Sequence, residues 1–398
     1  MRLEGVQFVG HSDLDGRPEG LQVVGTGDRV FIAHLFSGGF TEVSLTDPRR
    51  PRVLSFTAAP PNSWSVHLQV QGDLLLVSNG PDMWAAPIGF DPGRSLFESV
   101  SGYAAGVRIY DVSKPGHPRE IGFADVGGQG VHRIWFEGSD LAFVSAFPDG
   151  FDEGILLVLD LSDPTEPFEV DRYWIPGMGP NEEALRTWPD EFKVSLHHPI
   201  VRDGFVYGAW RDGGITVQPV ATSGALGSAT RLVWPGPDGL GSAAHTSLPL
   251  PEMGLVAVAE EGIESAGEPQ RRSVSMIDVH DPSDPRRIGT LPSPEVSPVA
   301  GARFGPHNLY EYRAGAWMDG SIVFSAHQGA GLLIYRVAAD GEATEVGRFE
   351  ADPPSTLLDP RPGRVAVRQT NDVFVTADGL MAVVDANGGL DILQLDLR

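Results

Sequence analysis

One pattern occurs four times in this chain and constrains its fold more than any other feature. Each copy has an apolar run, then an aspartate (serine in the first copy), an apolar residue and a Ser, Thr or His, followed by a proline-rich turn and a second apolar run. Apolar and β-branched residues favour pleated strands, and proline in the turn ends the ladder. Each copy therefore predicts a strand, a tight turn and a second strand. The copies span residues 40–54, 107–121, 156–170 and 274–288, with degenerate versions at 214–220 and 331–337.

Two further strand-like segments precede each copy, so the predicted repeating unit has four strands. The second unit illustrates the order, with strands expected at 66–70, 73–78, 107–112 and 120–124. The same order starts near residues 20, 64, 131, 194, 243, 305 and 369. A repeat architecture lets 398 residues fold around one axis instead of splitting into two or three domains. We predict an all-β fold: a single seven-bladed β-propeller domain over residues 1–398, with four-stranded antiparallel blades.

The seventh unit supplies only three of its four strands, at 371–375, 380–384 and 390–395. Residues 3–9 resemble the outermost strand of the second unit, at 119–124. We therefore expect residues 3–9 to complete the last blade and close the ring, which would remove an exposed sheet edge.

The repeated motif resembles the LVIVD repeat, which forms β-propellers. This resemblance covers most of the chain through the units given above. It implies the propeller fold and says little about activity.

Charge and composition restrict the partners that the chain can have. The formal net charge is −24, so nucleic acid and anionic membrane surfaces would be repelled. The absence of cysteine excludes disulfides, thiolate chemistry, iron–sulfur clusters and zinc fingers. No run of 18 apolar residues and no signal-like apolar segment is present. We expect a cytoplasmic protein with a small-molecule substrate and neither nucleic acid nor membrane as partner; a homo-oligomer is an open alternative.

Five of the 11 histidines stand at the same place, the start of the first strand in units two to six. The first strand of a blade lines the central channel, so these side chains should converge on the axis at one height. Packing does not require imidazole there, and neutral imidazole is a common metal ligand. We predict that three or four of them bind a metal ion and that the rest lie beside it. The alternative is that each is a hydrogen-bonded structural residue. The five are His67, His132, His197, His245 and His307.

A second set of polar residues is expected at the ends of the second strands, on the same face. His34 and His327 stand in matching contexts, Asp212 follows Trp210 and Arg211, and Glu260 precedes Glu261. A carboxylate beside a metal can orient a ligand or serve as a general base. We predict catalytic roles for Glu260, His34, His327 and Asp212; the alternative is that they only edge a wet channel. Strand alternation should send His198 away from His197, into the interface between blades.

Long connections at 79–105, 176–193, 261–272 and 352–364 are expected on the histidine face. The first two carry Trp, Met and Phe, which suits an apolar lid over a pocket. Packing on the propeller rim or a dimer contact is the alternative. A short helix is expected within 181–187.

The predicted histidine ring is similar in architecture to that of the carotenoid cleavage oxygenases, where four histidines hold a non-haem Fe(II). It is also similar to the selenium-binding protein/methanethiol oxidase family. The resemblance implies a mononuclear metal enzyme, most simply a non-haem iron oxygenase or oxidoreductase acting on a small, partly apolar organic substrate. Fe(II) is favoured, with Mn, Zn and Cu as alternatives. A metal-dependent lyase or hydrolase at the same site, and a non-catalytic binding or scaffold propeller, are the other hypotheses. A Ser-His-Asp hydrolase has little support, because no Gly-x-Ser-x-Gly motif is present.

Overall fold

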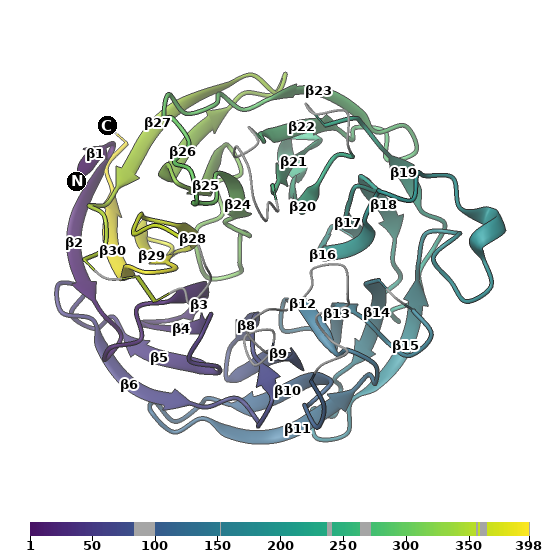
Figure 1. The fold of residues 1–398 in the computed structure, drawn as a ribbon, viewed down its shortest axis with the longest axis horizontal. Helices are drawn as coiled ribbons and strands as arrows, with labels where there is room; N and C mark the ends of the chain where they lie inside the picture. Colours follow the sequence, from purple (N-terminus) through teal and green to yellow (C-terminus); the bar gives the residue numbers. More distant parts are fainter. Residues whose placement is uncertain are drawn as a thin grey trace.

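The computed structural model describes residues 1–82, 100–151, 153–236, 241–262, 272–355, 357–358 and 364–397. Antiparallel sheets are arranged around a central axis, as in a β-propeller (Figure 1). Across these residues there is no α-helix, and two short 3-10 helices lie at Glu183–Leu185 and Pro251–Met253. In the same residues, no helix has the length and apolar character needed to cross a membrane.

The strands follow one another in groups that run outward from the axis. The first three groups are β3 (Gly20–Thr26), β4 (Arg29–His34), β5 (Phe40–Ser44) and β6 (Arg52–Thr57); β8 (Leu68–Gln71), β9 (Leu74–Pro81), β10 (Gly106–Asp111) and β11 (Arg119–Asp125); and β12 (Val131–Phe136), β13 (Leu141–Ala146), β14 (Ile155–Asp160) and β15 (Phe168–Tyr173).

The next groups are β16 (Val194–Arg202), β17 (Phe205–Arg211), β18 (Ile215–Pro219) and β19 (Thr230–Leu232); β20 (Ala244–Leu250), β21 (Leu255–Glu260), β22 (Val274–Asp278) and β23 (Arg286–Thr290); β24 (Gly305–Leu309), β25 (Ile322–Gln328), β26 (Gly331–Val337) and β27 (Ala343–Glu350); and β28 (Thr370–Val375), β29 (Leu380–Asp385) and β30 (Gly389–Leu395).

Hydrogen bonds join the described strands into six sheets. One sheet has eight strands, because a single residue pair, Arg211 with Ala244, links the β16–β19 group to the β20–β23 group. A two-residue strand, β7 (Ser63–Trp64), pairs with the end of β9. The predicted all-β architecture of four-stranded antiparallel units is confirmed.

The N-terminal segment joins the two ends of the chain. β2 (Val6–Ser12) pairs antiparallel with β30, from Val6 opposite Leu395 to Ser12 opposite Leu390. β1 (Arg2–Glu4) instead pairs with β27 of the preceding group. Gly5 separates the two strands at a φ of +61°, where a Cβ would lie 2.4 Å from the Val346 carbonyl oxygen. The expected pairing is therefore found from Val6 onward, and both termini lie on the same side of the ring (Figure 1).

The core lies between the sheets, because neighbouring sheets pack face to face. Inner strands such as β4 and β14 are buried on both faces, which explains their nearly continuous apolar sequences. Outermost strands such as β15 and β23 are mostly exposed. Burial therefore increases toward the axis.

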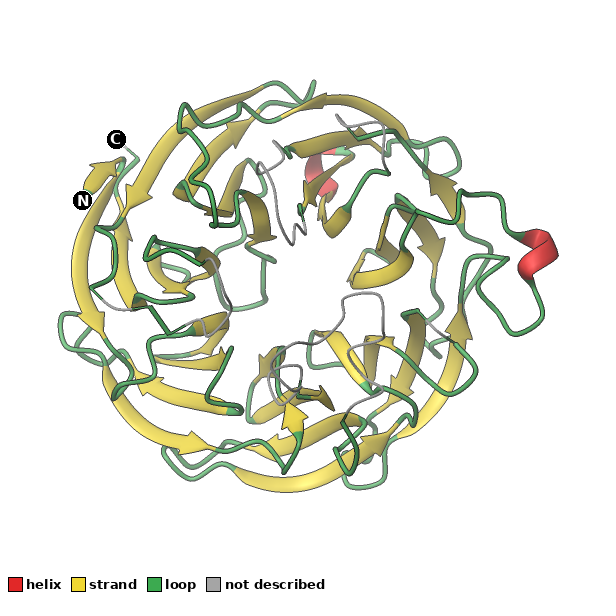
Figure 2. Cartoon of the chain, viewed as in Figure 1, coloured by secondary structure: helices red, strands yellow, loops and turns green. Residues whose placement is uncertain are grey.

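Most of the described loop at 176–193 lies at the outer rim, where Figure 2 shows its 3-10 helix projecting outward; only Lys193 at its end reaches the axis. Met178 and Trp188 pack against the core around β16 and β17. The guanidinium groups of Arg186 and Arg231 lie over the Trp188 ring. The apolar-lid expectation is wrong for this loop, because its aromatic and sulfur side chains cover the rim. The expected lid residues at 83–99, 263–271 and 359–363 lie outside the described residues.

Candidate metal centre

Local irregularities in the innermost strands decide which side chains reach the axis. A β-bulge interrupts the pairing of innermost strands with their neighbours, because one or more residues have no partner across the ladder. Such residues turn their side chains away from the face of the sheet. The bulges lie between Gly20 and Gln22, Val131 and Arg133, Val194 and His198, Ala244 and Thr246, Pro306 and Leu309, and Thr370 and Asp372.

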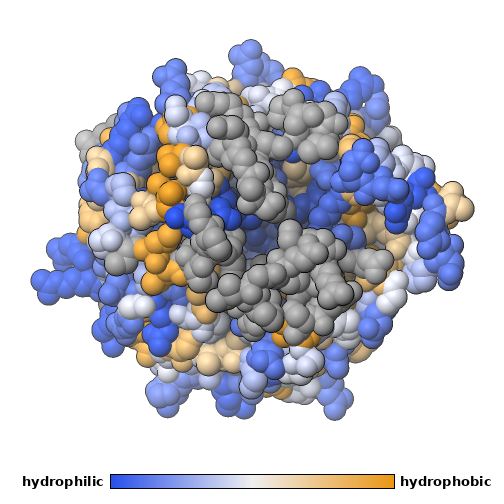
Figure 3. Space-filling model, viewed as in Figure 1, coloured by the Kyte–Doolittle hydropathy of each residue, from blue (hydrophilic) through white to orange (hydrophobic). Residues whose placement is uncertain are grey.

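The bulged residues line a cavity of about 350 Å³. Figure 3 shows a hydrophilic hollow near the centre of this face, with apolar residues along one flank. We call the ring of side chains at this height the mouth layer. Its members are Leu21, Val66, His132, His197, His245, His307 and Asn371.

One residue further along the chain, side chains in three of the groups each tie their sheet to the next. Asp372 Oδ2 accepts a hydrogen bond from the Val23 amide at 2.9 Å, and Gln22 Oε1 accepts one from the Leu68 amide at 2.7 Å. His67 Nδ1 accepts the Ile134 amide in the same way, at 3.2 Å. We call this set the latch layer. His67 belongs to it because Val66 takes the mouth position in its group.

The structure therefore brings four of the five predicted histidines together and places His67 in the layer below. The ring centroids of His132 and His197 are 4.6 Å apart, those of His197 and His245 are 3.9 Å apart, and those of His245 and His307 are 4.6 Å apart. The expectation that all five converge at one height does not hold for His67. The sequence pattern could not show this one-residue offset, because Val66-His67 and Val131-His132 read alike.

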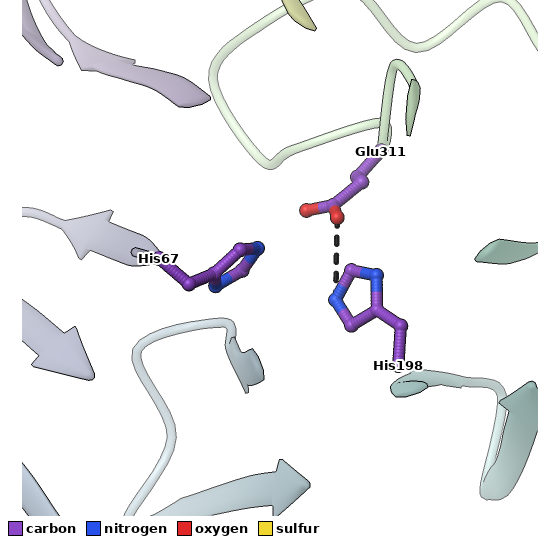
Figure 4. A group of neighbouring side chains, drawn as sticks. All are labelled: His67, His198 and Glu311. Carbon is purple, nitrogen blue, oxygen red and sulfur yellow. Dashed lines mark ion pairs between the residues drawn. The ribbon is translucent and has the colours of Figure 1, made fainter. Parts of the chain in front are cut away.

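Two groups of side chains in the described residues could hold a metal ion. The first, His197, His245 and Glu261, lies in the mouth layer and is fully buried. The second, His67, His198 and Glu311, lies in the channel (Figure 4). His198 was expected between blades, but the three-residue bulge before it resets the strand alternation. It turns toward the axis, with its ring centroid 5.1 Å from that of His67.

Hydrogen bonding makes the channel group the poorer metal site. His67 Nδ1 accepts the Ile134 amide, so the proton of the neutral ring is on Nε2. Figure 4 shows this ring directed toward His198 and Glu311, so it presents an N–H to them and not a lone pair. Glu311 already binds Arg313 at 2.5 Å and Gln69 at 3.2 Å. We therefore assign His67 and His198 a structural role and not a metal-binding one.

Two histidines of the mouth layer have the opposite tautomer, with the proton on Nδ1 and the lone pair on Nε2. His197 Nδ1 donates to the His245 carbonyl at 3.0 Å, and His307 Nδ1 donates to the Asn371 carbonyl at 2.7 Å. Because a carbonyl oxygen only accepts, both protons are on Nδ1 and both Nε2 atoms keep their lone pairs. Backbone carbonyls fix metal-ligating histidines in this way. Burial lowers the pKa of His132, His197, His245 and His307, which keeps these rings neutral at pH 7.

Glu261 stands at the centre of the mouth group. Its carboxylate contacts Arg211 at 2.7 Å and Arg303 at 3.1 Å, and it lies 3.6 Å from His245 Nε2 and 3.7 Å from His307 Nε2. Burial opposes ionisation, but the charges of Arg303 and Arg211 outweigh it and hold the pKa of Glu261 well below its usual range. A permanently charged carboxylate thus faces two imidazole nitrogens.

The carboxylates predicted as catalytic lie one residue away from the cavity. Glu260 Oε1 accepts hydrogen bonds from the Trp234 indole and the Ser275 hydroxyl, inside the sheet packing. Asp212 Oδ2 accepts the Lys193 amide at 2.9 Å. Neither lines the cavity, whereas their chain neighbours Glu261 and Arg211 do.

The two predicted catalytic histidines show the same offset. His34 is buried against Phe56, with Nε2 2.7 Å from the Thr41 hydroxyl. His327 is buried against Phe304, and its Nδ1 donates to the Gln328 carbonyl at 3.0 Å. Leu35 and Gln328, the next residues, line the cavity instead. His34, His327 and Glu260 stand at the ends of strands, but their side chains point into the sheet interfaces.

Three arginines at the cavity were not predicted as site residues: Arg133, Arg211 and Arg303. Arg133 donates from Nη2 to His245 Nε2 at 3.2 Å. The sequence held one signal for Arg133, which is its position directly after the predicted site residue His132. Arg303 lies in a connection outside the repeat, and nothing in the repeat pattern marks it.

The chain resembles solved β-propellers in fold. It matches the structure of U3-55K with a TM-score of 0.57 and 11% identity, over 98% of both chains. The β-propeller domain of Cps50 (Swd1) from Myceliophteria thermophila matches with a TM-score of 0.55 and 12% identity, over 98% of both chains. A Lactobacillus plantarum protein matches with a TM-score of 0.54 and 13% identity, over 100% of this chain and 97% of the other. No family model and no curated protein matches the sequence. These likenesses establish a β-propeller fold.

Proposed function

We propose that this protein is a metal-dependent enzyme whose mononuclear centre is held by His197, His245 and Glu261, with His307 beside it. The supporting observation is the tautomer arrangement: backbone carbonyls hold the Nδ1 protons of His197 and His307, and His245 Nε2 accepts from an arginine. The unprotonated nitrogens of His245 and His307 therefore face an ionised carboxylate. A group of two histidines and one carboxylate with open positions is typical of non-haem Fe(II) oxygenases. We therefore propose Fe(II) and an oxidoreductase activity on a small organic molecule.

The proposal includes the geometry of the whole ring. We count seven blades, treating the eight-stranded sheet as two blades joined at Arg211 and Ala244. His197, His245, Glu261 and His307 then come from three consecutive blades. This count is compatible with the LVIVD-like repeat and with the architectural similarity to the carotenoid cleavage oxygenases.

Each residue around the centre has a separate task in this proposal. Arg211 and Arg303 keep Glu261 ionised and orient its two oxygens. His132 Nε2 lies 2.9 Å from His197 Nε2, so a proton on His132 points at a ligand atom. With a metal held at His197 Nε2, this N–H would be available to donate to a bound molecule. The metal itself would supply Lewis-acid or redox chemistry.

The test is elemental analysis of protein purified without chelator or nickel affinity resin. We expect close to one equivalent of iron in the wild type and less than a tenth in His197→Gln and Glu261→Gln. The matched control is His67→Gln, which keeps an acceptor for the Ile134 amide and should retain the metal. Less than a tenth of an equivalent of any transition metal in the wild type, also after soaking with metal, would exclude this function.

Oxygen consumption separates the redox proposal from a lyase or hydrolase at the same centre. An iron-loaded protein that turns over a substrate without consuming oxygen would exclude an oxygenase and leave the metal site intact. Substitution of iron by zinc should abolish an oxygenase and need not abolish a hydrolase.

A further inference from the structure

We propose that the cavity binds an anion, a carboxylate or a phosphate monoester, whose head group pairs with Arg133 and whose apolar body lies along the opposite wall. This inference rests on the proposed function only in taking the cavity as the place where the small molecule binds.

The charge of the cavity differs from that of the molecule. Among the described residues, Arg133, Lys193, Arg211 and Arg303 line it together with one carboxylate, Glu261. The chain as a whole carries a formal net charge of −24. A basic cavity in an acidic protein raises the local concentration of anions and repels cations.

Arg133 is the residue that most clearly requires an anion. It is 4% exposed, its Nε has no hydrogen-bond partner, and no carboxylate in the described residues forms an ion pair with it. Its contact at the cavity is with the uncharged nitrogen of His245. Asp372, Glu311 and Glu261 act on its charge only from beyond ion-pair distance. A ligand anion would supply the contacting partner that a buried guanidinium needs.

The neighbouring arginines carry more positive charge than their shared carboxylate neutralises. Arg211 and Arg303 share the same carboxylate, Glu261, so one negative charge serves two guanidinium groups. A second anion placed among Arg133, Arg211 and Arg303 would complete the pairing. Guanidinium groups bind carboxylates and phosphates through paired N–H donors, which gives orientation as well as affinity.

The other side of the cavity is apolar. Leu35, Phe36 and Trp64 line it; Leu35 and Phe36 follow β4, and Trp64 lies in β7. Arg211 lies on β17, which Figure 1 shows across the axis from β4. A volume of about 350 Å³ suits a compact molecule with an aromatic or aliphatic body and one charged end.

Isothermal titration calorimetry with three probes tests the proposal: 3-phenylpropanoate, its neutral analogue 3-phenylpropanamide, and phenyl phosphate. We expect at least one anion to bind the wild type tenfold or more tightly than the amide. The tighter of the two anions identifies the head group. Equal affinity for amide and anions, or no binding of either anion at millimolar concentration, would overturn the proposal.

Variants assign the selectivity to Arg133. Arg133→Gln should abolish the preference for the anion, Arg133→Lys should keep part of it, and Arg336→Gln is the charge-matched control because Arg336 is exposed on β26. Arg303→Gln provides a second reading if Arg133→Gln does not fold. Undiminished anion selectivity in both Gln variants would contradict the proposal. Iron content is measured on the same samples to separate the anion site from the metal centre. A variant that loses anion selectivity but retains iron tests the anion site alone.

Discussion

Neighbouring residues at the mouth of this propeller have entirely different environments. Glu261 is an ionised carboxylate beside two imidazoles, whereas Glu260 is held inside the sheet by Trp234 and Ser275. The residue types at the site were visible in the sequence. Which member of each adjacent pair faces the cavity depends on where the strand ends, and side chains that differ by one residue point to opposite faces.

His34 illustrates a histidine with a structural role and a measurable pH effect. Burial lowers its pKa to about 4, a shift that Glu19 opposes and Arg17 adds to. The unfolded chain takes up a proton near pH 6.5 and the folded chain does not, so stability falls as the pH drops from 6.5 towards 4.

We expect the unfolding free energy of His34→Gln to fall less between pH 7 and pH 4.5 than that of the wild type, by about 2 kcal/mol. Urea denaturation at the two pH values measures this difference. His117→Gln is the control, because His117 is exposed and should leave the pH dependence unchanged. Identical pH dependence in the wild type and His34→Gln would contradict the assignment.

At the scale of the strand, the β-bulge is the element that builds the site. It releases residues from the ladder towards the cavity and returns the next residues to the channel, where they accept amides from the following sheet. Sequence reasoning located the innermost strands and their histidines, because hydrophobic alternation marks a strand. It missed the inward turn of His198, because a three-residue bulge changes the side-chain alternation without altering the residue pattern. It also missed the offset of His67, which directly precedes β8.

The latch layer should contribute to stability in proportion to the amides it satisfies. Gln22→Leu preserves side-chain size but leaves the Leu68 amide buried without an acceptor. We expect a loss of about 1–3 kcal/mol in unfolding free energy, measured by urea denaturation. Gln7→Leu on the exposed face of β2 is the control and should change stability by less than about 0.5 kcal/mol. A comparable small effect for both variants would mean that the latch has no energetic role.

At the scale of the molecule, the ring depends on the pairing of its two ends. β2 shields the edge of β30 along the register from Val6 to Ser12, and an unpaired edge is a site for association with another chain. The repeat in the sequence predicted this closure, because the last group lacked its outer strand. The pairing of β1 with β27 was not predicted, since the turn at Gly5 has no counterpart in the other groups.

Deletion of residues 1–12 should lower the melting temperature markedly and promote self-association, as measured by calorimetry and size-exclusion chromatography. Deletion of residues 1–4 is the matched control, because it removes β1 and leaves the β2–β30 ladder intact. Similar melting temperatures for the two deletions would show that β2 does not close the ring.

Metal binding at the proposed centre should stabilise the ring, because the ligands lie on β16, on β20 and directly after β21. We expect chelator treatment to lower the melting temperature of the wild type and excess metal to restore it, since a ligand that binds only the folded state stabilises it. The melting temperature of His197→Gln should respond to neither treatment. A response in His197→Gln equal to that of the wild type would place the metal elsewhere.

The bulges also separate residues that stabilise the fold through strand pairing from residues that can be substituted. A side chain released from the ladder contributes little to strand pairing, so a substitution there alters the cavity while the latch layer below keeps the sheets together. Leu21, Val66 and Asn371 hold the mouth positions that lack imidazole. Asn371 also bonds Gly20 and Gln328 of the neighbouring sheets, so it is the least replaceable of the three. New ligands or substrate contacts can therefore be introduced at Leu21 and Val66 without redesigning the scaffold, which makes the molecule a practical starting point for directed evolution.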